Sequence, residues 1–174
     1  MTVPASPARP RSDALPRIRA FLEAIGIPVT EGDVGYDPFL PGVKIDRGGL
    51  VFDPASLRWP GDLLHEAGHL AVAPGDVRAS LGDALEPLVA EPGAGEVEAI
   101  AWSYAAVVHL GLDPSVLFHA EGYLGRSEAL LVSFSLGVYP GAFGLARLGL
   151  TLLAPDAAAT GESPYPRMTR WLRD

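Results

Sequence analysis

The chain has 174 residues, of which 48% are hydrophobic and 20% charged, and this composition is typical of a globular protein with a core of its own. Its formal net charge of −8 argues against a general nucleic-acid-binding protein, which needs a basic face. Cysteine is absent, so disulfide bonds and thiolate metal sites are excluded, and a bound metal would have to be held by His, Asp or Glu. The N-terminal residues lack the apolar segment of a secretory signal, and we expect a cytoplasmic protein.

The first third of the chain predicts one helix and one β-hairpin. Residues 1–12 are rich in Pro, Ala and Arg and are expected to form a flexible arm. Ser12 is a suitable helix N-cap, and apolar residues follow at helical spacing as far as Gly26. Two short apolar segments, residues 43–45 and 50–52, then flank a loop with two glycines, as in an antiparallel hairpin.

The rest of the chain is predicted to be mostly helical. A buried helix is expected over residues 62–73 and a second long helix over residues 96–110. The most apolar stretch, residues 129–153, is interrupted by several glycines, so we expect two buried helices joined by a turn and no membrane span. Residues 13–174 are therefore predicted to form a single α+β domain, with a small antiparallel sheet and a mostly helical C-terminal half.

The most informative segment is His65-Glu66-Ala67-Gly68-His69, which contains two of the four histidines of the chain. Histidines four residues apart lie on one face of a helix, about 6 Å apart along its axis, so both imidazoles can reach one ion. Glu66 is placed to take a proton from a water that the metal activates. Gly68 is expected to leave room for a substrate beside the metal. The alternative is a helix whose two histidines make only ordinary hydrogen bonds.

A catalytic zinc site also needs a third protein ligand, and the next predicted helix offers two acids. We choose Glu98, because Trp102 and Ala105 continue its helix face as an apolar surface that can pack on the motif helix. Glu96 lies off that face, near the helix start where an acid is favoured in any case, and it stays open as the alternative.

An oxyanion formed during hydrolysis needs a hydrogen-bond donor opposite the metal. The glycine-rich segment 118–125 offers His119 and Tyr123 as candidate donors, with an ordinary turn as the alternative. Acids are also expected to orient the two motif imidazoles through their second ring nitrogens. The candidates for this orienting role are Asp53, Asp62, Asp76 and Glu128.

The order of these features resembles the gluzincins, zinc metallopeptidases in which a second helix supplies a glutamate ligand, and among them the minimal ImmA/IrrE-type group. The similarity covers residues 40–110, where a strand pair precedes the His-Glu-x-x-His helix and Glu98-Ala99-Ile100 follows it. The resemblance implies a zincin-like fold, with His65, His69 and Glu98 as ligands of Zn2+ and Glu66 as the catalytic base.

These observations predict a zinc-dependent metallopeptidase that acts on a peptide or protein substrate and has no nucleic-acid or membrane partner. Two other functions fit the same residues. The first is a catalytically silent metal-binding scaffold that binds a partner, and the second is a metallohydrolase of small molecules. The sequence gives no indication of an oligomeric state.

Overall fold

A computed structural model of the chain describes residues 11–35, 40–82 and 95–174. In chain order the described elements are α1 (Arg11–Ala24), β1 (Val29–Glu31), β2 (Val43–Asp46), β3 (Gly49–Phe52), α2 (Gly61–Val72), α3 (Gly75–Arg78), α4 (Glu96–His109), the 3-10 turns η2 (Pro114–Val116) and η3 (Tyr123–Gly125), α5 (Ser127–Ser135), α6 (Ala142–Arg147) and α7 (Ala154–Thr160). The α+β class is as predicted. Residues 1–10 of the predicted arm lie outside the described residues, and α1 begins at Arg11.

The three described strands form one mixed sheet in the order β1-β3-β2. The predicted hairpin is confirmed, because β2 and β3 pair antiparallel, with Asp46 opposite Gly49. Its two turn residues, Arg47 and Gly48, both have positive φ angles, as a two-residue hairpin turn requires. The prediction of a wholly antiparallel sheet is wrong, since β1 joins the other edge of β3 in parallel.

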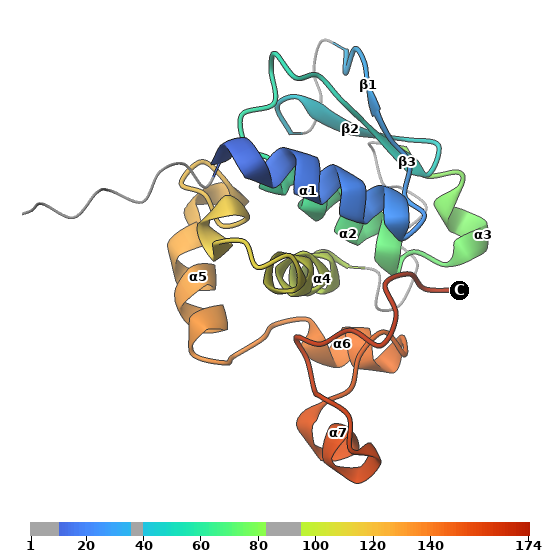
Figure 1. Ribbon diagram of the computed structural model, residues 1–174, viewed down its shortest axis with the longest axis vertical. Coiled ribbons are helices and arrows are strands. Elements are labelled where there is room, and N and C mark those ends of the chain that lie inside the picture. The colour runs from blue at the N-terminus through green and yellow to red at the C-terminus, as the bar shows by residue number, and fades with distance from the viewer. Residues whose placement is uncertain (1–10, 36–39, 83–94) are drawn as a thin grey trace, which may run out of the picture.

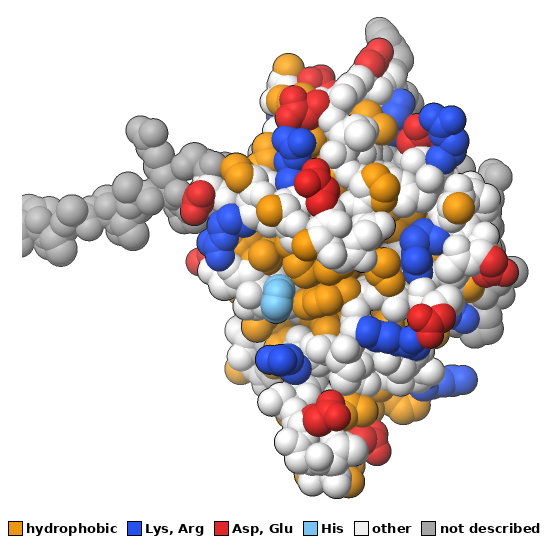
Figure 2. Space-filling view, turned by 45° about the vertical axis from the view of Figure 1, so that its right-hand side comes forward, with side chains coloured by type: hydrophobic (Ala, Val, Ile, Leu, Met, Phe, Trp, Pro, Cys, Tyr) orange, Lys and Arg blue, Asp and Glu red, His pale blue; other side chains and the backbone are white. Residues whose placement is uncertain are grey.

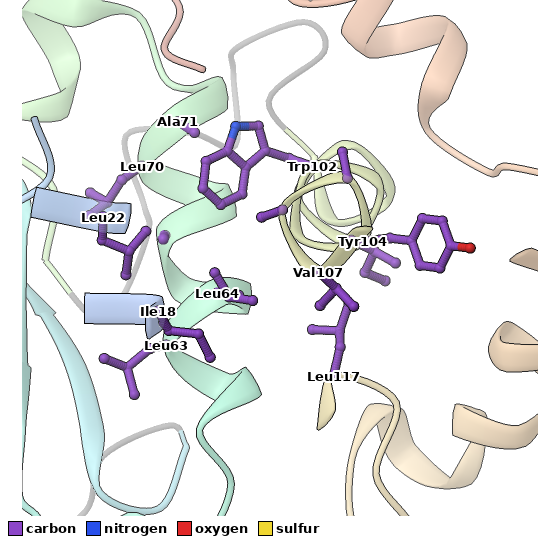
Figure 3. Close-up of a cluster of buried hydrophobic side chains, with 14 of the residues drawn as sticks. Ile18, Leu22, Leu63, Leu64, Leu70, Ala71, Trp102, Tyr104, Val107 and Leu117 are labelled. Carbon is purple, nitrogen blue, oxygen red and sulfur yellow. The ribbon is translucent and has the colours of Figure 1, made fainter. Parts of the chain in front are cut away.

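Helix α2 lies at the centre of the layers (Figure 1), with the sheet and α1 on one side and α4 on the other. All twelve of its residues are buried, because the helix has apolar or small side chains on almost every face. The core around it combines Ile18 and Leu22 of α1 with Leu64 of α2 and Trp102 of α4 (Figure 3). The predicted motif helix is therefore an interior element of the fold.

Helices α2 and α4 approach closely at Gly68. A Cβ atom on Gly68 would lie 2.6 Å from the Ala99 carbonyl oxygen and 2.9 Å from Ser103 Oγ. Ser103 Oγ in turn donates a hydrogen bond to the carbonyl oxygen of Leu64, 2.8 Å away. The space beside Gly68 is thus filled by the backbone of α4, which corrects the prediction that this glycine leaves room for a substrate.

The C-terminal segment closes the end of α2. The backbone N–H of Arg173 donates to the carbonyl oxygen of Ala71 (2.9 Å), and the Arg78 guanidinium donates to those of Leu70 (2.8 Å) and Ala73 (3.1 Å). Carbonyl groups at a helix C-terminus have no partner within the helix and carry partial negative charge, so two arginine-bearing segments suit this end.

Figure 2 shows a face of the molecule on which an apolar area lies among basic side chains.

The apolar stretch at residues 129–153 forms two helices, α5 and α6, joined by a turn, as predicted. They are not buried as expected, because Val132 of α5 is 51% exposed and Phe143 of α6 is 65% exposed. The N-cap of α6, Gly141, lies against α4, where its Cβ position would be 1.9 Å from the Val97 carbonyl oxygen, and within α6 only Ala142 and Leu145 are buried. No helix within the described ranges is long and apolar enough to cross a membrane.

Candidate metal centre

The two motif histidines are brought together on one face of α2. Both side chains are buried, and their ring centroids lie 5.0 Å apart with the ring planes nearly perpendicular, at 89°. This arrangement follows from the four-residue spacing, which stacks the side chains one turn apart.

A third donor is supplied by Glu96, the first residue of α4. One carboxylate oxygen of Glu96 lies 3.5 Å from His65 Nε2, and the other lies 3.3 Å from His69 Nε2. The three ligand atoms are all within 4.8 Å of one another, so this group could hold a metal ion. Zinc bonds of about 2.0–2.1 Å in a tetrahedron place neighbouring donor atoms roughly 3.4 Å apart, and each histidine has one Glu96 oxygen near this distance.

The choice of Glu98 as the third ligand is corrected to Glu96. Glu96, Ala99 and Ser103 follow the spacing i, i+3, i+7 and share the helix face that meets Gly68 of α2. The carboxylate of Glu98 instead lies beside Gly144 of α6, 2.2 Å from where a Cβ of that glycine would be. Because Gly68, Ala99 and Ser103 are small, α4 packs closely on α2, and this packing brings Glu96 to the histidines.

The protonation states of His65 and Glu96 suit metal binding. Burial and, to a smaller extent, the charge of His69 lower the pKa of His65 to about 4, although the charge of Glu96 acts in the opposite direction. Burial raises the pKa of Glu96, but the hydrogen bond with His69 and the charges of both imidazoles outweigh it and lower the pKa overall. Near neutral pH the site therefore offers a neutral imidazole at His65 and an ionised carboxylate, the forms that bind a metal ion.

Tyr123 reaches the same site from η3. Its hydroxyl oxygen lies 3.4 Å from His65 Nδ1, the ring nitrogen that faces away from Glu96. In the tautomer that keeps the Nε2 lone pair for a metal, Nδ1 carries the proton and donates it to this hydroxyl. Burial and the charges of Asp62, Glu96 and Glu66 raise the pKa of Tyr123 well above 10, so the phenol stays protonated. The predicted donor to an oxyanion is thus placed where it orients a histidine.

Glu66 is buried in α2 next to His65, as the motif predicts. Its charge contributes to raising the pKa of Tyr123, whose hydroxyl contacts His65. The helix therefore holds a candidate base beside the candidate metal ligands.

His119 pairs with Asp62 one helical turn before His65. Its Nε2 atom lies 2.9 Å from Asp62 Oδ1, and its ring stacks on Trp59 at 4.5 Å, with an angle of 3° between the planes. Burial raises the pKa of Asp62, whereas the hydrogen bond and the charge of His119 lower it. His119 Nδ1 is buried and has no hydrogen-bond partner among the described residues. Asp62, one of the acids expected to orient a motif imidazole, thus binds His119 instead.

No family model, curated protein or solved structure matches this chain. The likeness to the gluzincins, and the zincin-like fold that it implies, stay predictions. What the structure contributes is the convergence of His65, His69 and Glu96.

The turn that carries Tyr123 has an unusual backbone that the sequence analysis did not foresee. Tyr123 and Leu124 both have a φ angle of 53°, and Gly125 follows with 80°. A left-handed conformation costs about 1–2 kcal/mol for a residue with a Cβ atom, and such residues gather at functional sites. In the sequence, Gly122 and Gly125 indicate a turn in this segment. They do not predict that the two residues between them adopt a left-handed conformation.

Proposed function

We propose that this protein is a zinc-dependent metallopeptidase, which hydrolyses a peptide or amide bond with Glu66 as general base. The observation that supports it most is the convergence of His65 Nε2, His69 Nε2 and the Glu96 carboxylate at distances that suit tetrahedral zinc. Two imidazoles and one carboxylate are one of the ligand sets of catalytic zinc sites. The resemblance of the motif to the gluzincins supports the same proposal.

His65, His69 and Glu96 would hold the zinc ion, which would supply Lewis acidity to polarise the scissile carbonyl and to lower the pKa of a water molecule. Glu66 takes the proton of that water as it attacks the carbonyl carbon and then passes the proton to the leaving amine. Tyr123 holds His65 in the tautomer that directs Nε2 to the metal.

Of the two predicted oxyanion donors, His119 is the better candidate. Tyr123 is engaged with His65, whereas His119 keeps one ring nitrogen without a partner among the described residues. Asp62 Oδ1 lies 2.9 Å from the other nitrogen, and His119 could donate to an oxyanion in the form that carries a proton on Nδ1.

The variant Glu66→Gln tests the proposal, because glutamine has the shape of glutamate but takes up no proton. We expect the variant to keep its zinc and to hydrolyse a fluorogenic peptide library at least about 100-fold more slowly than the wild type. Glu98→Gln is the matched control, since Glu98 lies beside Gly144, and it should keep full activity. Undiminished hydrolysis by Glu66→Gln, or turnover of small amides but of no peptide, would overturn the proposal.

A further inference from the structure

The η3 turn is held rigidly in its left-handed conformation. The N–H of Gly125 donates to the Gly122 carbonyl oxygen (3.1 Å) and the N–H of Arg126 to that of Tyr123 (3.0 Å). Ser127 Oγ also donates to the carbonyl oxygen of Gly122, 3.1 Å away. The positive φ angles of Tyr123 and Leu124 are therefore part of a bonded turn and not of a loose loop.

The two neighbouring side chains of this turn differ in their surroundings. Tyr123 points into the site, where its hydroxyl contacts His65. Leu124 is 99% exposed, more than any other large hydrophobic residue in the described part of the chain. A leucine is unfavourable here on two counts, because asparagine or glycine tolerates the left-handed backbone better and an exposed isobutyl group gains nothing from folding. Neither the backbone nor the packing of the folded chain accounts for Leu124.

A second exposed apolar residue follows a candidate metal ligand directly in the sequence of α4. Val97 is half exposed and directly follows Glu96, which contacts both motif histidines. Leu124 directly follows Tyr123, which contacts His65. Each apolar side chain is therefore next in sequence to a residue that touches the site, one on each of two elements.

We infer that Leu124 is a specificity-determining residue, which contacts an apolar side chain of the peptide bound at the metal centre. The inference rests on the proposed function and deepens it, because it names the substrate class as peptides with an apolar residue beside the scissile bond. A substrate side chain on Leu124 removes apolar surface of both molecules from water, and this gain accounts for a leucine at a position that the fold alone disfavours.

The test uses two hydroxamic-acid dipeptides that differ only in one side chain, leucine or serine, and the zinc-loaded full chain. By calorimetry the wild type should bind the leucyl compound about tenfold more tightly than the seryl compound. Leu124→Asn should reduce this ratio to about one with the zinc content unchanged, because asparagine suits the turn but offers no apolar contact. Leu136→Asn, an exposed leucine at the other end of α5, is the matched control and should keep the tenfold ratio.

A Leu124→Asn protein that keeps the tenfold ratio, or a Leu136→Asn protein that loses it, would overturn the inference. A lower melting temperature of Leu124→Asn would also contradict it, because it would show that the leucine serves the fold. The two proposals fail separately, since hydroxamate binding needs no turnover. If the wild type hydrolyses peptides but Leu124→Asn keeps the binding ratio of the two compounds, only the role of Leu124 is contradicted. If the binding ratio depends on Leu124 but the protein hydrolyses no peptide, only the proposed peptidase activity is contradicted.

Discussion

Helix α2 and the segment formed by η3 and α5 meet at one site but differ in how they are built. Every residue of α2 is buried, whereas in α5 only Ser127 and Phe134 are, and the neighbouring Leu124 is almost fully exposed. The two candidate metal ligands of α2 are thus held by the interior of the fold, whereas η3 and α5 beside them are largely exposed. Changes in α2 should alter stability and metal binding together, and changes in η3 should alter the site alone.

The largest expected effect comes from lowering the pH of the metal-free protein, which acts on the buried region. The pKa of His65 is about 4 in the folded chain, against an ordinary value of 6.5, so the unfolded chain binds a proton over this interval and the folded chain does not. The contribution of His65 to the free energy of unfolding is therefore fully present above pH 6.5 and is lost as the pH falls toward 4. This loss is about 3 kcal/mol at most.

Urea unfolding at a series of pH values measures this loss. Because the pKa of Glu96 is also lowered in the folded chain, protonation of this carboxylate should reduce the free energy of unfolding further at more acidic pH. His65→Gln is the control and should remove most of the dependence between pH 6.5 and 4. An equal slope in the wild type and in His65→Gln would show that the histidine is not held neutral by burial.

Gly68→Ala tests the close approach of α2 and α4. The new Cβ atom would meet the Ala99 carbonyl oxygen at 2.6 Å, so α4 has to move. We expect a loss of about 2 kcal/mol in the free energy of unfolding, despite the better helix propensity of alanine, and weaker zinc binding as Glu96 shifts. Gly82→Ala is the matched control, because nothing lies within 4 Å of its Cβ position, and it should change stability little. A Gly68→Ala protein as stable as the wild type would contradict this packing.

Tyr123→Phe tests the contact between the two regions and has the smallest expected effect on stability. Removing the hydroxyl leaves His65 Nδ1 without this partner, so we expect about tenfold weaker zinc binding in competition with a chelator. The melting temperature should stay nearly unchanged, because the ring still packs against His65 and Phe118. The spectrum of the cobalt-substituted protein should also shift, and a variant with wild-type zinc affinity and spectrum would show that the hydroxyl does not orient His65.

The sequence was most informative where a local pattern determines the geometry. The spacing of His65 and His69 along one helix is sufficient to bring the imidazoles together, and two short apolar segments around a Gly-containing loop are sufficient for the hairpin. The parallel pairing of β1 depends on how the chain returns to the sheet, and a three-residue strand carries no local signal for it.

The third donor could not be chosen from the sequence, because the orientation of α4 on α2 decides it. The apolar face with Trp102 suggested Glu98, but α4 meets α2 through Ala99 and Ser103, and this face ends at Glu96. Small residues opposite Gly68 were the available signal, since a glycine inside a buried helix indicates a close helix neighbour. The strain at Tyr123 and Leu124 has no signal in residue type at all, because both residues normally avoid positive φ angles.

The zinc content of the wild type, Glu96→Ala and Glu98→Ala, measured by elemental analysis of the purified proteins, tests the central claim most directly. The two variants remove neighbouring acids of the same helix turn, only one of which contacts the histidines. We predict one zinc ion per chain in the wild type and in Glu98→Ala, and loss of the metal in Glu96→Ala. Zinc that persists in Glu96→Ala and disappears in Glu98→Ala, or a wild type that binds no metal after addition of zinc, would contradict the site described for His65, His69 and Glu96.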